Sequence, residues 1–198
     1  GHSVSISGDY MIVGASSGNY AYIFTRNGTN WTQQQKLVST DRQSEDNFGY
    51  SVAISGDYAI VGAPFDDGDG TSGQYNSGSA YIFKRSGNTW YEKAKFIPDN
   101  TQTDDFFGHG VSISGDYAIV GSPGDDTYKG GAYIFTRVTD TTWTKQKIVT
   151  DIRVNNDYLG VTVSISGDYA IVGGTDANTA YIYKRNASTG VWGDEQKI

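Results

Sequence analysis

Short apolar stretches in this chain alternate with small polar residues, which is the period-two pattern of β-strands that bury one face. The first example is Val4–Ser7, which leads through a Ser-Gly-Asp turn into a second stretch at Met11–Ala15. Two further strand-like stretches follow at Ala21–Thr25 and Trp31–Leu37, separated by the hairpin signal Asn27–Thr29. The pattern therefore predicts four short antiparallel strands, joined in sequence order as a meander.

This unit is repeated four times along the chain. The phrase Ile-Ser-Gly-Asp-Tyr occurs once per repeat, with its glycine at Gly8, Gly56, Gly115 and Gly167. A Tyr-Ile-Phe-like phrase and then one tryptophan follow in each repeat, and the tryptophans are Trp31, Trp90, Trp143 and Trp192. Four units in 198 residues give about 50 residues per repeat. The tryptophans begin the outermost strands, where we expect them to fill the core between repeats.

A four-stranded meander cannot bury both faces alone, so we expect the units to stack radially as the blades of an all-β propeller. The expected domain is a single repeat domain over residues 1–198, with blades at approximately 1–47, 48–105, 106–157 and 158–198. A β-solenoid is the second possibility, although its coils are normally shorter. Four blades predict a segment of a larger ring, completed by further blades or by a second copy; a compact four-bladed ring is the alternative.

Composition narrows the function classes. The chain has 15 Lys and Arg against 22 Asp and Glu, a net charge of −7, which disfavours nucleic acid as a partner. It has no cysteine, so disulfides and thiol nucleophiles are excluded. No apolar stretch approaches the ~18 residues of a membrane span.

Two motifs in each repeat resemble a known family. Phe48-Gly49 is followed by Val61–Pro64, Val-Gly-Ala-Pro, and the third repeat has Phe107-Gly108 in the same place. In the fourth repeat, the first motif is Leu159-Gly160, with leucine in place of phenylalanine. This arrangement resembles the FG-GAP repeat of integrin α-subunit propellers. The resemblance implies one blade per repeat, usually seven in a closed ring, and a role in adhesion or recognition outside the cell.

The chain departs from the integrin pattern at the calcium loop. Several integrin blades carry an Asp-rich calcium loop between the two motifs, whereas each repeat here has only Ser-Gly-Asp-Tyr. That turn is too short to surround a cation that needs six to eight oxygen ligands. We therefore expect the integrin-type sites to be missing, with turn roles for Asp9, Asp57, Asp116 and Asp168.

The loops between the second and third strands, and those between blades, carry most of the variation and share one face of a propeller. We expect binding to occur on this face. The candidate Ca²⁺ ligands are Asp66, Asp67 and Asp69 in the second repeat and Asp125 and Asp126 in the third. Solvated acidic loops are the alternative. Tyr75 and Tyr128 are candidates for stacking against a sugar or peptide, with ordinary loop packing as the alternative.

Catalytic signals are weak. His2 and His109 occupy the repeat position that holds Tyr50 and Val161 elsewhere, which favours packing. Adjacent aspartates, as in 104–105, are poor candidates for an acid and base pair, because such work needs perturbed pKa values. We expect no enzyme. Three glycosylation sequons, at Asn27, Asn30 and Asn186, fall in exposed hairpins between third and fourth strands.

The third repeat is one residue shorter after its tryptophan than the other three. Because a one-residue slip exchanges the faces of a strand, we expect a bulge elsewhere to absorb the difference.

The predicted function is a non-enzymatic, extracellular module for adhesion or protein recognition. A structural repeat module of a surface assembly or filament, and a lectin-like carbohydrate binder, are the alternatives. The predicted partner is thus a protein or glycan ligand outside the cell.

Overall fold

The computed structural model describes the chain except for residues 69–73, 99, 150–155 and 176–178. The described residues form four antiparallel sheets of four strands each, and each sheet keeps the sequence order of its strands. We number these sheets as blades 1 to 4. The strands are β1 (Ser3–Ser7), β2 (Tyr10–Ala15), β3 (Tyr20–Asn27) and β4 (Asn30–Leu37) in blade 1; β5 (Val52–Ser55), β6 (Tyr58–Ala63), β7 (Ser79–Ser86) and β8 (Thr89–Phe96) in blade 2; β9 (Val111–Ser114), β10 (Tyr117–Ser122), β11 (Gly131–Arg137) and β12 (Trp143–Ile148) in blade 3; and β13 (Thr162–Ser166), β14 (Tyr169–Gly173), β15 (Ala180–Arg185) and β16 (Trp192–Lys197) in blade 4.

The all-β propeller class expected from the sequence is confirmed. The four strands predicted for the first repeat agree with β1 to β4 to within two residues at each end. Short helical turns, η1 (Ser16–Gly18) and α1 (Asp125–Tyr128), lie in the loops between second and third strands. No helix in the described residues has the length and apolar character needed to cross a membrane.

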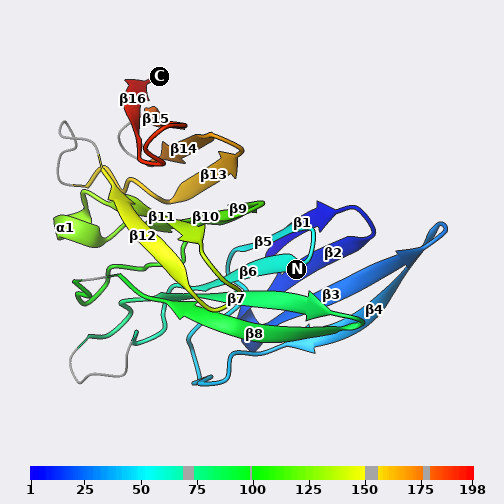
Figure 1. The fold of residues 1–198 in the computed structure, drawn as a ribbon. Coiled ribbons are helices and arrows are strands. Elements are labelled where there is room, and N and C mark those ends of the chain that lie inside the picture. The colour runs from blue at the N-terminus through cyan, green and yellow to red at the C-terminus, as the bar shows by residue number, and fades with distance from the viewer. Residues whose placement is uncertain (69–73, 99, 150–155, 176–178) are drawn as a thin grey trace.

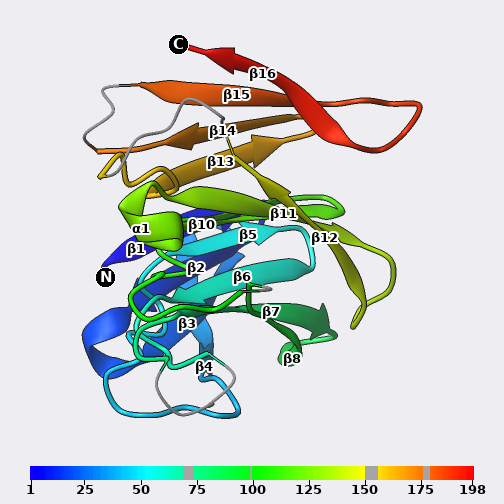
Figure 2. The same cartoon turned by 90° about the vertical axis from the view of Figure 1, so that its left-hand side faces the viewer.

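The blades follow one another along an arc. The first strands β1, β5, β9 and β13 lie side by side, each against its neighbour in the next blade. Blades 1 and 4 lie at the two ends of this arc, with blades 2 and 3 between them, and the two chain termini are well separated (Figure 1). The outer hairpin turns and the loops that carry η1 and α1 lie on opposite sides (Figure 2).

Serine hydroxyls join each first strand to the next. The N–H groups of Val52 and Ile54 donate to the Oγ atoms of Ser3 and Ser5 at 3.1 and 3.2 Å. The first strand of a blade is a sheet edge, so these N–H groups have no partner within their own sheet. The same contact recurs at the later junctions, from Val111 to Ser51, Gly115 to Ser55, Ile165 to Ser112 and Gly167 to Ser114. The alternating serines of the sequence thus satisfy the edge of the following blade.

The two sequence motifs meet at the same junctions. Gly49 has a φ of +94° and donates its N–H to the carbonyl of Gly62 at 3.0 Å within blade 2. Its own carbonyl lies against Gly14 of blade 1, where an added β-carbon would overlap the oxygen. Phe48 is fully buried, with its ring 5.4 Å from that of Tyr81 in an edge-on contact. The motifs are therefore the two halves of one blade-to-blade contact.

Each blade junction encloses an apolar core. At the first junction, Ile12 and Ile23 of blade 1 pack with Val52, Ile54 and Trp90 of blade 2. The tryptophan side chain is 2% exposed, as expected for a residue that fills the space between blades. Two further clusters occupy the junctions between blades 2 and 3 and between blades 3 and 4.

The one-residue difference of the third repeat is absorbed by bulges that lie elsewhere, in the other three blades. The outer hairpins of blades 1, 2 and 4 have register shifts, which lie between Ile23 and Phe24, between Ile82 and Phe83, and between Ile182 and Lys184. In blade 3, β11 and β12 pair without any shift. The residue missing from the third repeat is therefore the bulge residue itself, and the side chains keep their faces because the hairpin is regular.

The Ser-Gly-Asp-Tyr turns are anchored by arginines from the third strand of the same blade. Asp9 pairs with Arg26 at 2.6 Å, and Asp168 pairs with Arg185 at 2.7 Å. Blades 2 and 3 repeat the arrangement with Asp57–Arg85 and Asp116–Arg137. These aspartates are turn residues with an ion-pair partner. Such exposed pairs contribute little to stability.

Candidate functional site

A hollow of about 510 Å³ on the loop face lies between blades 1 and 2. Three loops form it: β2–β3, β4–β5 and β6–β7. Its lining comprises Ser16, Ser17, Asn19, Gln43, Ser44, Glu45, Asp46, Asn47, Phe65, Asp67, Tyr75 and Asn76. These residues comprise three carboxylates, four amides, three serines and two aromatic side chains, and include no lysine or arginine.

Asn19 ties two of these loops together. Its φ of 57° places it in the left-handed region, which asparagine tolerates better than most residues. Its Nδ2 donates to the carbonyl of Gln43 at 2.7 Å, and its Oδ1 accepts from the backbone N–H of Phe48 at 3.0 Å. One buried amide therefore fixes the wall of the hollow against the blade junction.

Asp46 lies at the base of the hollow and is buried. Its Oδ2 accepts from the backbone N–H of Gln43 at 2.7 Å, which closes a local turn. Burial, with smaller contributions from the charges of Asp66 and Asp41, raises the pKa of this carboxyl to about 6. At neutral pH the hollow thus contains a carboxylate held in an unfavourable environment for its charge.

Blade 3 repeats this carboxylate. Asp105 is buried and accepts from the backbone N–H of Gln102 at 2.7 Å. Burial again raises its pKa to about 6, with the charge of Asp125 adding to the effect. Sequence analysis missed Asp46 and Asp105 as a pair, although both stand two residues before the buried phenylalanine of the first motif.

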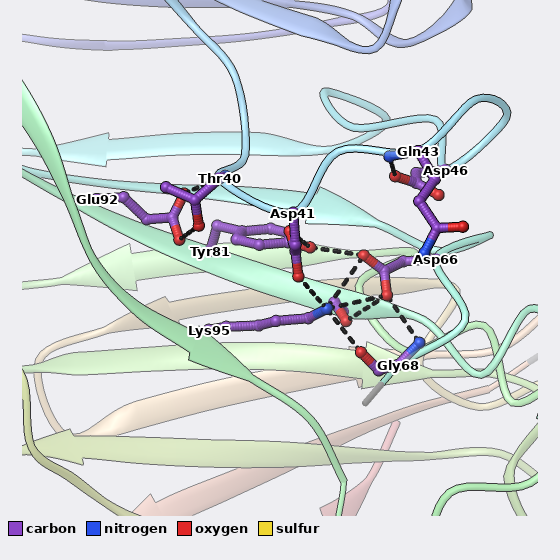
Figure 3. A network of polar contacts seen from close by, with 10 residues as sticks. Thr40, Asp41, Gln43, Asp46, Asp66, Gly68, Tyr81, Glu92 and Lys95 are labelled. Atoms are coloured by element: carbon purple, nitrogen blue, oxygen red, sulfur yellow. Dashed lines mark hydrogen bonds and ion pairs between the residues drawn. The ribbon is translucent and has the colours of Figure 1, made fainter. Parts of the chain in front are cut away.

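Asp66, next to Asp67 of the hollow, lies in a network of polar contacts (Figure 3). Its carboxylate accepts from the Tyr81 hydroxyl at 2.5 Å, the Ser79 hydroxyl at 3.0 Å and the Gly68 N–H at 2.7 Å. The Lys95 ammonium lies 3.1 Å from Oδ1 and 3.3 Å from Oδ2. Lys95 is thus the counter-ion of this buried carboxylate.

Two further contacts complete the network. Asp41 accepts from the same Lys95 ammonium at 2.6 Å and from the Tyr81 hydroxyl at 2.9 Å. Burial, and then the charge of Asp66, raise the pKa of the tyrosine hydroxyl, which therefore remains a hydrogen-bond donor. Blade 3 contains the same arrangement, with Asp125 bound by Lys147 at 2.5 Å and by Tyr133 at 2.9 Å.

The candidate calcium ligands do not fit a metal site at these positions. The oxygens of Asp66 and Asp125 are already bound by a lysine ammonium and a tyrosine hydroxyl, contacts that a cation would have to replace. Asp67 accepts from the Asn76 N–H at 3.1 Å, and Asp126 pairs with Lys129 at 3.6 Å. Across the described ranges, no three or more Asp, Glu, His or Cys side chains gather as metal ligands would. The remaining candidate, Asp69, lies outside the described residues.

The two candidate tyrosines lie in different environments. Tyr75 is 65% exposed and lines the hollow beside Asn76 and Asp67. Tyr128 instead packs against Tyr158, with ring centroids 5.5 Å apart. Of the two tyrosines, Tyr75 is the one that lines this hollow.

The histidine positions form a stack near the inner ends of the blades. The Tyr50 ring lies 4.5 Å from His2 and 4.8 Å from His109. Because the carbonyl of Val161 can only accept, Nδ1 of His109 donates to it at 3.1 Å, and the Tyr50 hydroxyl then donates to Nε2 at 3.1 Å. Burial lowers the pKa of His109. The stack joins three blades. The sequon residues Asn27, Asn30 and Asn186 are exposed in the outer hairpins, away from it.

Four antiparallel blades, with variable loops gathered on one face around a polar hollow, define a β-propeller module. Comparison with known proteins agrees with this class. The FG-GAP repeat model matches residues 31–83 and 90–135, half of the chain. The chain belongs to the FG-GAP repeat family. No curated protein sequence matches it.

A solved structure shares the fold. The crystal structure of a putative 6-phosphogluconolactonase from Bacteroides uniformis superposes with a TM-score of 0.70 at 17% sequence identity. The match covers 100% of this chain and 54% of that chain, so the four blades span about half the length of that structure. At this identity the likeness concerns the fold alone.

Proposed function

We propose that this propeller is a non-enzymatic recognition module that works outside the cell and binds a protein ligand in the hollow between blades 1 and 2. The observation that carries the proposal is the hollow itself. It lies on the variable loop face, it is about 510 Å³ in volume, and its polar walls are held by hydrogen bonds to the blade junction.

The charges of the hollow favour a basic side chain as the bound group. Glu45, Asp46 and Asp67 face the same space, and no cationic side chain lines it. A lysine or arginine of the ligand would supply the missing positive charge, while the amides of Asn47 and Asn76 add hydrogen-bond partners. The positive charge of that lysine or arginine would also stabilise the ionised carboxylate of Asp46.

The surroundings favour binding over catalysis. The two carboxyls with a pKa raised to about 6, Asp46 and Asp105, lie in different blades, and each closes a backbone turn. His109 uses both of its ring nitrogens within the aromatic stack. Family membership supports the extracellular location, because FG-GAP repeats are typical of extracellular proteins.

Binding can be tested by titrating a panel of lysine- and arginine-containing peptides while recording amide chemical shifts. We expect shifts at residues 43–47 and 74–76, and a loss of at least about tenfold in affinity in Glu45→Gln combined with Asp67→Asn. A matched control, Asp57→Asn with Asp116→Asn, removes two carboxylates from the turns of the opposite face and should retain affinity. Shifts confined to that opposite face would refute the proposal.

Carbohydrate binding is the second candidate, favoured by the exposed ring of Tyr75 beside a carboxylate and an amide. Sugars commonly stack on an aromatic ring and bond to such polar groups. A glycan array distinguishes the two. Glycan binding that is lost in Tyr75→Ala, with no response to the basic peptides, would favour the carbohydrate.

A further inference from the structure

A glutamine joins the outer strands of neighbouring blades at the first and third junctions of the chain. Gln35 of β4 bonds to both backbone groups of Trp90 in β8. Its Nε2 donates to the carbonyl at 2.8 Å, and its Oε1 accepts from the N–H at 2.8 Å. Gln146 of β12 does the same with Trp192 of β16, at 2.6 and 3.0 Å. One side-chain carboxamide therefore closes the outer edge of each of these junctions.

The middle junction, between blades 2 and 3, differs at this position. Gln35 and Gln146 each pair with the isoleucine of the third strand in their blade, and the residue that does so in blade 2 is Ala94. The tryptophan of the following blade is Trp143. A methyl group can neither donate nor accept a hydrogen bond, so Ala94 cannot make the contact with Trp143 that the two glutamines make.

The backbone of Trp143 is presented as that of Trp90 is. Val138 donates its N–H to the carbonyl of Thr142 at 2.9 Å, which closes the β11–β12 hairpin. The next pair of this ladder is Arg137 with Trp143. Bonded and non-bonded pairs alternate in an antiparallel ladder, so the backbone groups of this pair face away from each other. Because β12 is the edge of its sheet, the N–H and C=O of Trp143 face outward.

The tryptophan rings are also placed alike. Trp90 meets the ring of Tyr10 edge-on at 5.9 Å, and Trp143 meets that of Tyr58 edge-on at 6.5 Å. The indole N–H of Trp90 donates to the side chain of Gln34 at 3.2 Å. That of Trp143 is buried and has no hydrogen-bond partner among the described residues. The middle junction thus lacks both side-chain partners that the first junction supplies.

A cleft of about 270 Å³ lies where the glutamine is absent. Its lining includes Ala94, Phe96, Phe135, Thr141 and Trp143. The rings of Phe96 and Phe135 stack face to face at 3.9 Å and form an apolar wall. The cleft therefore combines an apolar surface, suited to methylene groups, with the outward backbone groups of a tryptophan.

The two blades are held together here by contacts outside the cleft lining. Asp140, in the β11–β12 hairpin, accepts from the hydroxyl of Tyr58 and from the ammonium of Lys84, both at 2.5 Å. Tyr58 and Lys84 belong to blade 2, so this carboxylate bridges the junction. The spacing of the blades is thus set without a glutamine.

We propose that this cleft binds a glutamine side chain of a partner polypeptide, which makes with Trp143 the contact that Gln35 makes with Trp90. A primary carboxamide has a donor and an acceptor on one carbon, and both can point toward the same residue. In a trans peptide bond the N–H and C=O point in opposite directions, so a ligand backbone cannot replace it. A carboxylate can only accept. This site is separate from the hollow between blades 1 and 2, and neither proposal depends on the other.

Disulfide tethering suits weak binding of this kind, because the chain has no cysteine and one can be placed at the cleft. Thr141→Cys, at an exposed position of the lining, is equilibrated with aliphatic thiols of matched lengths that end in a carboxamide, a carboxylate or a methyl group. We expect the carboxamide to be captured at least about fivefold over the other two. Ala187→Cys, exposed in the outer hairpin of blade 4, is the control and should show no preference. Equal capture of the three thiols by Thr141→Cys would overturn the proposal.

A second variant supplies the missing side chain from the chain itself. Ala94→Gln should abolish the preference of Thr141→Cys for the carboxamide. On its own it should slow hydrogen exchange of the Trp143 backbone N–H about fivefold, the effect of one added hydrogen bond. Ala94→Met has a similar volume without a polar head and should not slow this exchange. A preference that survives Ala94→Gln would place the carboxamide elsewhere and would refute the proposed contact.

Competition identifies the source of the carboxamide. The blocked peptide acetyl-Gly-Gln-Gly-methylamide, at millimolar concentration, should reduce capture of the carboxamide thiol by Thr141→Cys. Free glutamine should have a smaller effect, because its charged amino and carboxylate groups would lose water beside the phenylalanine wall. A peptide without effect would overturn the proposal, and a reduction by free glutamine alone would assign the cleft to the amino acid instead of a polypeptide.

Discussion

The buried carboxyls Asp46 and Asp105 lead to a quantitative prediction about pH. Each accepts one backbone N–H, from Gln43 and Gln102, and lacks a cation of its own because the nearby lysines pair with other aspartates. Their pKa values rise from 3.8 to about 6 through burial. Two pKa units at about 1.4 kcal/mol each mean that ionising either carboxyl costs the folded chain about 3 kcal/mol.

The sign follows from proton linkage. Since the pKa in the folded chain lies above the unfolded value, the folded state binds the proton more tightly. The contribution of each carboxyl to stability is therefore fully present below about pH 4 and is lost as the pH rises through about 6. Asn keeps the oxygen that accepts the N–H and has no charge, so Asp46→Asn should remove this dependence.

Urea denaturation followed by tryptophan fluorescence, at a series of pH values from 4 to 8, measures the effect. The free energy of unfolding of Asp46→Asn minus that of wild type should rise by about 2 to 3 kcal/mol over this range, with its midpoint at about pH 5, between the unfolded and folded pKa values, and should level off above about pH 6. Taking the difference cancels the opposing contribution of His109, whose lowered pKa makes stability fall as the medium becomes acidic. Glu45→Gln, an exposed neighbour, should change stability by less than about 0.5 kcal/mol throughout. A difference that is independent of pH would refute the argument.

Three further predictions concern the blade junctions, the polar network and calcium. Gly62→Ala should destabilise the chain by about 3 kcal/mol in the same urea assay, because the added methyl group overlaps a carbonyl oxygen of the next blade. The control Gly193→Ala places its methyl group in open space and should be near neutral. Equal effects of the two substitutions would contradict this account. Lys95→Met should cost about 3 kcal/mol because it leaves the buried carboxylate of Asp66 without its counter-ion. Lys93→Met, in the same strand, serves as control, and an unchanged Lys95→Met protein would show that the ion pair is not needed. Because the carboxylate of Asp66 is already paired, millimolar calcium should not raise the melting temperature of the wild type through this residue. An increase that disappears in Asp66→Asn would contradict this expectation.

The fold can be predicted well from the sequence because the same strand and turn signals occur in all four repeats. The Ser-Gly-Asp turn, the alternation of Val4 and Ile6 with serines, and one tryptophan per unit each define a strand or a turn. Local chemistry decides these features, so the strands agree with the structure to within two residues. The repeats indicate that a bulge must absorb the one-residue difference, but they do not say which hairpin is the regular one, and the structure places the bulges in the other three blades.

The site was harder to predict because its properties depend on contacts between distant residues. In the sequence, Asp66 stands in an acidic, glycine-rich loop that resembles a calcium-binding loop. Only the fold brings the ammonium of Lys95, 29 residues later in the chain, to 3.1 Å from its carboxylate. Asp46 is an unremarkable loop aspartate until burial raises its pKa. The loop face was predicted correctly as the variable one, since loop length can be read directly from the repeats.

The serine contacts between first strands have a consequence for how such a chain changes in length. Each junction joins hydroxyls, such as those of Ser3 and Ser5, to backbone N–H groups that any copy of the repeat would also present. A duplicated unit would therefore arrive with both halves of the contact already in place and could be inserted between any two neighbours. The number of blades is thus not encoded at any single junction, and copy number can vary by recombination without new complementary surfaces.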